Sequence, residues 1–140
     1  MTILATIAAL AALHGAALQS GWTWTLYEDG PLVLANEIPD TPELKAILEC
    51  QAGSGVARLD LYGSTGAGIA TIASGGATAT GQSEAASDHQ SVALRTDHPV
   101  FSQFLVNGEL DVAVGGAHQA VAVQPVHLAK LRRFAELCCG

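Results

Sequence analysis

Apolar and polar positions alternate along much of the chain after residue 21, in the pattern typical of half-buried β-strands. Strands are predicted at 22–26 and 32–35, on either side of the turn-forming sequence Glu28-Asp29-Gly30-Pro31. The prolines of the segment 38–42 then end the second strand. Two further apolar runs, 46–50 and 56–62, flank Gly53-Ser54-Gly55 and predict a hairpin in which Cys50 faces the core.

A second hairpin is predicted around Asn107-Gly108, which separates the apolar runs 101–106 and 109–114. Asn-Gly favours the type I′ turn because that turn needs positive φ at both central residues. On this interpretation Asp97-His98-Pro99 forms a turn, and Pro99 begins the next strand. Gly115-Gly116 then leads to a third strand of the meander at 119–123.

Small residues dominate the segment 63–87, which is almost entirely Gly, Ala, Ser and Thr. Its two β-prone runs, 68–73 and 77–80, can pair across Gly75-Gly76. Because strands of small side chains specify their register weakly, we expect an edge hairpin or a mobile flap.

The chain ends in a predicted helix over 126–139, in which Leu128, Leu131 and Cys138 recur at helical spacing. Three cations, Lys130, Arg132 and Arg133, lie on its exposed side. Cations near a helix C-terminus complement its dipole, and the alternative is that they dock an acidic partner or anionic lipid. The predicted fold is therefore mainly β, an antiparallel β-sandwich or flattened barrel with a C-terminal α-helix, forming one domain over 21–140.

Residues 1–20 form a separate, signal-like apolar leader. An apolar run at 3–13 is followed by Gly15-Ala16-Ala17, which offers small residues for cleavage after Ala17, although the basic region that usually precedes such a run is missing. The alternatives are a packed N-terminal helix and a membrane anchor, for which the run is short. We expect export to the periplasm or beyond and no integral membrane span.

Composition and charge limit the classes of molecule that the protein is expected to bind. The formal net charge is −7, and all six Lys and Arg residues follow position 44. Because nucleic-acid binding needs cations that neutralise phosphates, nucleic acid is excluded as a partner. A protein partner or self-association is expected instead. Aromatic residues make up only 5% of the chain, so the core should be thin and should gain from a disulfide.

The three cysteines are Cys50, Cys138 and Cys139. Cys50 and Cys138 both face inward in the predicted elements, which favours a Cys50–Cys138 disulfide and leaves Cys139 as a possible free thiol. Cys50–Cys139 pairing is the alternative, and the remaining thiol could bridge two copies. No CxxC spacing is present, so no metal site or cofactor is predicted.

The sequence contains few residue patterns that are typical of catalytic sites. The Asp88-His89 and Asp97-His98 pairs are sequence neighbours, which point to opposite faces of a strand, and no serine has the GxSxG context of a hydrolase. Gly63-Ser64-Thr65-Gly66 lacks the Lys-Ser/Thr of a phosphate loop. Trp22 and Trp24 are interpreted as core anchors. No catalytic residue is assigned.

Several short motifs resemble a group of small secreted proteins of alphaproteobacteria. The motifs are Trp24, Gly30-Pro31-Leu32, Ile38-Pro39-Asp40-Thr41, Leu48-Glu49-Cys50, Gly53-Ser54-Gly55-Val56 and Phe134-Ala135-Glu136-Leu137-Cys138. The resemblance implies a secreted location and a disulfide between the strand cysteine and the terminal helix. It implies no activity, and the doubled Cys138-Cys139 departs from its pattern.

The resulting hypothesis is a small exported, non-enzymatic binding or structural module of the bacterial envelope, with self-association as one mode of action. One alternative is an inhibitor of an extracellular enzyme that presents the loop 63–76. The other is a hydrolase with a dispersed His/Asp/Ser site that uses His89, His98 or His118. An exposed sheet edge would favour assembly, and a deep pocket with convergent polar groups would favour an enzyme.

Overall fold

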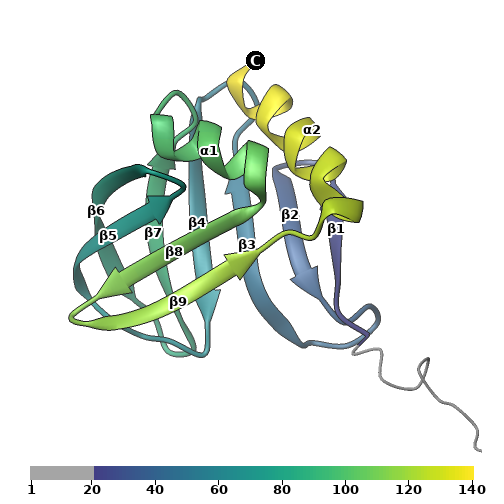
Figure 1. Cartoon of the computed structure of the whole chain (residues 1–140). Helices are drawn as coiled ribbons and strands as arrows, with labels where there is room; N and C mark the ends of the chain where they lie inside the picture. The colour runs from purple at the N-terminus through teal and green to yellow at the C-terminus, as the bar shows by residue number, and fades with distance from the viewer. Residues whose placement is uncertain (1–20) are drawn as a thin grey trace, which may run out of the picture.

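A computed structural model describes residues 21–140 (Figure 1). Nine strands form one antiparallel sheet in the order β1-β2-β3-β4-β7-β6-β5-β8-β9. The elements are β1 (Thr23–Tyr27), β2 (Leu32–Glu37), β3 (Leu44–Cys50), β4 (Val56–Tyr62), β5 (Gly68–Ser74), β6 (Ala77–Ala85), β7 (His89–Arg95), α1 (Pro99–Asn107), β8 (Glu109–Val114), β9 (Ala117–Ala122), the 3-10 turn η2 (Pro125–His127) and α2 (Leu128–Cys139).

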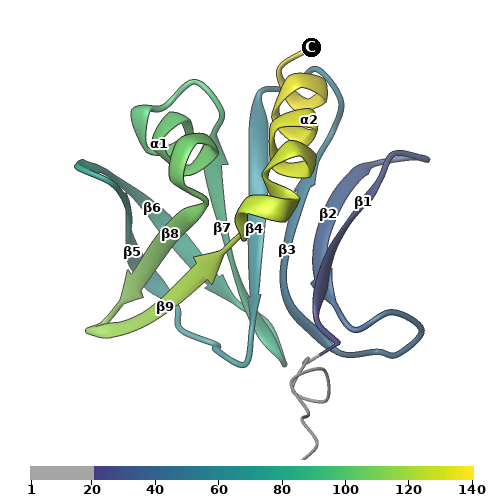
Figure 2. The same ribbon diagram turned by 45° about the vertical axis from the view of Figure 1, so that its right-hand side comes forward.

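The sheet curls into a half-barrel, and both helices lie at one end of its concave side (Figures 1 and 2). Alternate residues of the strands point into this concave side, where the helices supply the larger apolar side chains. The largest fully buried side chains are Trp24, Leu34, Leu48, Leu59, Leu61, Ile72, Val92, Phe101, Phe104, Leu110, Leu131 and Phe134. The expected mainly β fold with a C-terminal helix is confirmed.

The hairpin of β3 and β4 has the predicted pairing, with Cys50 opposite Ala57 and Leu48 opposite Leu59. Its turn also holds the end of α2, because the Gly53 N–H donates to the Leu137 carbonyl at 3.0 Å. The predicted Cys50–Cys138 disulfide is present, with an S–S distance of 2.02 Å, and joins the same two elements. The terminal helix is thus fixed to the sheet by covalent and backbone bonds.

The prediction of a strand over 101–106 is wrong, because this segment is helix α1. The His98 imidazole accepts the Val100 N–H at 3.1 Å, Pro99 occupies the first turn, and Gly108 ends the helix with φ of 73°. Asn-Gly therefore serves as a helix C-terminus rather than as a type I′ turn. Pro99 begins a helix, not a strand, since its fixed φ suits the first helical turn.

The small-residue segment is neither an edge hairpin nor a flap. β5 and β6 do pair across Gly75-Gly76, with Ser74 opposite Ala77, but in the strand order they lie between β7 and β8, and β6 pairs with β7 through Glu84 and Ala85. The loop before β5 is also held, since the side-chain oxygen of buried Gln90 accepts the Gly66 N–H at 2.8 Å. The segment 63–76 is therefore part of the sheet, with Gly75 and Gly76 exposed at the β5–β6 turn.

The predicted leader, residues 1–20, lies outside the described residues. Within residues 21–140, neither helix has the length and apolar character needed to cross a membrane.

Candidate docking edge

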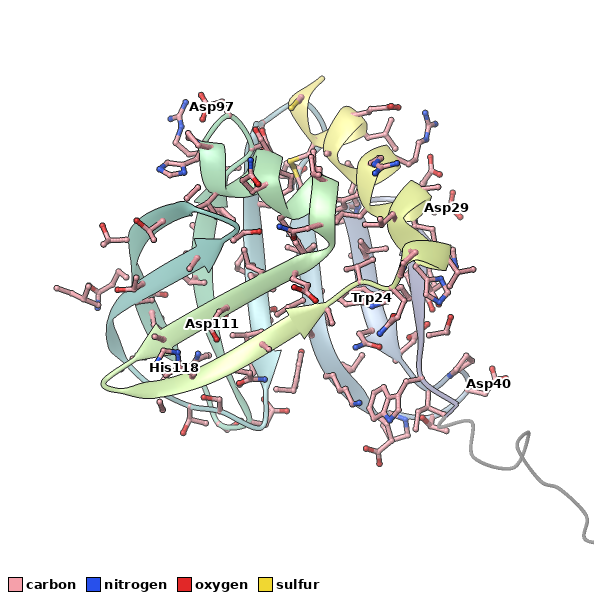
Figure 3. The ribbon with its side chains drawn as sticks, in the orientation of Figure 1. Trp24, Asp29, Asp40, Asp97, Asp111 and His118 are labelled. Atoms are coloured by element: carbon pink, nitrogen blue, oxygen red, sulfur yellow. A yellow bond between two sulfur atoms is a disulfide. The ribbon has the colours of Figure 1, made fainter. Side chains whose placement is uncertain are left out.

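The outermost strand β9 presents backbone groups away from the rest of the sheet. The Trp24 indole N–H donates to the carbonyl of Ala122 at 3.0 Å, and Trp24 lies on β1 at the opposite end of the sheet (Figure 3). The Ala122 carbonyl therefore points away from β8. Backbone groups alternate along an antiparallel strand, so Ala120 and His118 turn their N–H and C=O groups the same way.

The sequence of this part of β9 and its pairing with β8 lack the features that commonly protect a sheet edge. Its sequence, AHQAVA, contains neither Pro, Lys, Arg nor an acid, and its pairing with β8 runs from Val114–Ala117 to Glu109–Ala122 without a bulge. Natural sheets commonly block their edges with such features, because open edges pair with other chains. β9 is thus an open template for another strand.

The other edge strand, β1, is contacted by two side chains of the terminal helix. The Lys130 ammonium of α2 donates to the carbonyl of Trp24 at 2.6 Å, and Arg133 of the same helix reaches Glu28 at 3.3 Å. From the Trp24–Ala122 contact, β9 runs away from β1, so β1 does not cover the remainder of β9 (Figures 1 and 2).

A shallow hollow of about 440 Å³ adjoins the β9 edge. Glu109 and Asp111 supply its carboxylates, and Ala120 and Ala122 lie beside them on β9. Because alanine side chains end at Cβ, Ala120 and Ala122 leave space between the hollow and the open edge, while the exposed His118 of β9 pairs with Asp111 at 2.8 Å. None of the six Lys and Arg residues lines the hollow.

The histidines proposed for a hydrolase have separate roles. His98 caps α1, as described above. The His89 ring nitrogen lies 2.7 Å from Asp88, and its ring centre is 4.9 Å from that of Tyr62. His118 pairs with Asp111 at 2.8 Å on the β8–β9 hairpin (Figure 3). Within residues 21–140 no histidine is hydrogen-bonded to a serine.

A polar cluster on the convex face includes the buried Asp60. The Ser91 hydroxyl donates to its carboxylate at 2.6 Å, and the guanidinium Nε of Arg58 donates to it at 3.1 Å. Arg58 also pairs with Glu49, and the hydrogen bond that Arg58 donates to Asp60 raises the pKa of Arg58 above its ordinary value. Each charge in the cluster has an opposite partner, which makes it a structural ion-pair network.

An apolar groove of about 610 Å³ separates the solvent sides of α1 and α2 and is lined by Ser102, Leu105, Val106, Arg132, Ala135, Glu136 and Cys139. Cys139 is an exposed free thiol, as predicted. The Arg132 guanidinium donates to the Leu105 carbonyl at 3.2 Å, so it ties the two helices together across the groove. The three cations for which partner docking was the alternative interpretation have separate contacts: Lys130 contacts β1, Arg132 lies in this groove and Arg133 pairs with Glu28.

The part of the chain that the structure describes contains no cluster of three His, Cys, Asp or Glu residues able to hold a metal ion. No protein-family model, curated protein or solved structure matches the sequence.

Sequence reasoning missed the β9 edge as a site. The strand itself was predicted, but its place at the end of the sheet depends on pairings between segments far apart in sequence, such as Ala70 with Val114. The only local signal was the absence of charge from 117–122.

Proposed function

We propose that the protein is an exported, non-enzymatic binding module that recruits an extended protein segment by strand addition to β9. The observation that carries the proposal is the orientation of the Ala122 carbonyl, which shows that β9 directs every second pair of backbone groups outward. Backbone pairing supplies affinity in this mode, and neighbouring side-chain sites supply specificity.

The disulfide supports the export part of this proposal. Cys50–Cys138 links residues 88 apart in the sequence, and such bonds persist in oxidising compartments such as the periplasm and the extracellular space. The apolar leader 1–20 is the sequence feature that accords with this location.

The test uses one substitution that removes an outward backbone donor. In Ala120→Pro, the N–H that faces an incoming strand is lost, whereas the β8 pairing is spared because proline is tolerated where the N–H points away from the sheet. Ala120→Thr is the matched control, since it adds a β-branched side chain at the same position and keeps the N–H.

Twelve-residue peptides are selected from a randomised display library against the full wild-type chain alone, and the affinity of each binder is then measured for Ala120→Pro and Ala120→Thr. We expect binders that retain affinity for Ala120→Thr and lose at least tenfold with Ala120→Pro. Amide hydrogen exchange at His118 and Ala120 should slow in the complexes. A library that yields only binders insensitive to Ala120→Pro, or binders that protect the α1–α2 groove instead, contradicts the proposal.

A further inference from the structure

The hollow beside β9 adds a chemical requirement on the partner, and this inference rests on the function proposed above. We infer that the segment added to β9 carries a Lys or Arg side chain that reaches the carboxylates of Glu109 and Asp111.

Ala122 is opposite Glu109, and Ala120 is opposite Asp111. All four lie on the outer face, because the intervening Leu110 and Val121 are buried. A residue of an added strand that is opposite Ala120 shares this face and lies two strand spacings, about 9.6 Å, from Asp111. A long side chain on the partner crosses the small Ala120 to reach the carboxylate, whereas a short one does not.

The negative charge of Glu109 and Asp111 favours a positively charged group at the end of the partner's long side chain. Glu109 is exposed, the Asp111 side chain is 40% exposed, and no Lys or Arg of this chain lines the hollow. His118 is the one basic group that contacts Asp111 within the described residues, and its side chain is 65% exposed. A partner acid here would meet like charge, since opposite-charge pairs stabilise neighbouring strands and like charges destabilise them.

A second copy of this chain fits the hollow less well than a basic segment does. Pairing β9 with the β9 of another copy brings the sequence AHQAVA to the edge, which offers no Lys or Arg. Each copy also carries a net charge of −7, so long-range repulsion opposes the approach. We therefore assign the edge to a different protein whose extended segment is basic.

The experiment uses the peptides whose binding is abolished by Ala120→Pro. We expect Lys or Arg to be enriched at one position of these peptides. Replacing it by norleucine, which keeps the apolar stem and removes the charge, should weaken binding to the full chain at least tenfold. The double variant Glu109→Gln/Asp111→Asn should bind the lysine and norleucine peptides with affinities within twofold of each other. Glu84→Gln, an exposed acid on β6, is the control and should keep the tenfold preference.

The outcomes separate the inference from the proposed function. If binding depends on the Ala120 N–H but norleucine costs less than twofold, strand addition stands and the cation requirement is wrong. If Ala120→Pro has no effect on any binder, the proposed function fails and this inference fails with it. The last measurement is the oligomeric state of the protein alone by sedimentation. A dimer that dissociates in the Ala120→Pro variant would show that β9 binds a second copy of this chain, and it would overturn the inference.

Discussion

The close approach of Gly108 to the segment after β9 makes a quantitative prediction about stability. Gly108 ends α1 with φ of 73°, its N–H donates to the Phe104 carbonyl, and its own carbonyl accepts the Val123 N–H at 2.7 Å. A Cβ added at Gly108 would lie 2.2 Å from the Val123 carbonyl oxygen and 3.1 Å from Leu128. Ordinary van der Waals contacts begin at 3.4 Å, so the backbone must move.

Gly30 supplies the comparison for Gly108→Ala. It has φ of 87°, and a Cβ added there meets no atom within 4 Å. Gly30→Ala therefore measures the left-handed backbone strain alone, about 1–2 kcal/mol. Gly108→Ala carries the same strain, loses or distorts the Val123 bond at about 1 kcal/mol, and disturbs the packing of Leu128 by about 1 kcal/mol or more. We expect it to lower the free energy of unfolding by at least about 3 kcal/mol.

The assay is equilibrium unfolding in urea with the disulfide intact, followed by tryptophan fluorescence, because Trp24 is buried in the native state. Equal slopes against urea for the wild type and both variants allow the midpoints to be compared as stabilities. If Gly108→Ala and Gly30→Ala destabilise the protein equally within about 0.5 kcal/mol, the close approach contributes nothing and the reasoning is refuted.

Two other changes have expected magnitudes. Replacing both Cys50 and Cys138 by Ala should lower the free energy of unfolding by about 4.6 kcal/mol, the chain-entropy value for a crosslink between residues 88 apart. The control Cys139→Ala should lower it by less than about 0.5 kcal/mol, and denaturant unfolding measures both. A loss below about 1 kcal/mol in the double variant would show that the backbone bonds alone hold α2. Trp24→Phe removes the indole donor to Ala122 and should cost about 1–3 kcal/mol by the same measurement, whereas an unchanged midpoint would mean that this bond adds no stability.

The strands predicted from local alternation were mostly found, because each pairs with a neighbour that is close in sequence. β3 and β4 are examples, since the Gly53-Ser54-Gly55 turn and the two apolar faces agree on one register. The disulfide was predictable for the same reason: Cys50 and Cys138 each fell on an inward face of its own element. The predicted strands and the predicted disulfide both rest on the periodicity of apolar side chains, which can be read from a single sequence.

The error at 101–106 has a local cause. Asn107-Gly108 needs positive φ in both a hairpin turn and a helix C-terminus, so the dipeptide alone does not separate them. The deciding residues lie at the other end of the segment, where His98 caps and Pro99 starts a helix. Reading the start signals together with the end signal would have favoured the helix.

The candidate edge was beyond sequence reasoning because it depends on sheet order. Inserting β5 and β6 between β7 and β8 moves the small-residue hairpin into the sheet and leaves β9 outermost. Neither the weak register preference of β5 nor the composition of β9 specifies that order. Long-range pairings such as β5 with β8 decide it, and they cost loop-closure entropy that local patterns do not reveal.

The two ends of the sheet differ in a way that stability alone does not explain. At β1 the protein places the Lys130 ammonium of α2 on the Trp24 carbonyl and pairs Arg133 of the same helix with Glu28. At β9 it could guard the edge with one Lys or Pro at His118 or Ala120, since both sites are exposed and neither contributes to the core. A protecting residue at such a position would cost little stability, and it would prevent the unwanted pairing that open edges promote. An open edge bordered by Glu109 and Asp111 is therefore best explained by a strand partner whose charge those two carboxylates select.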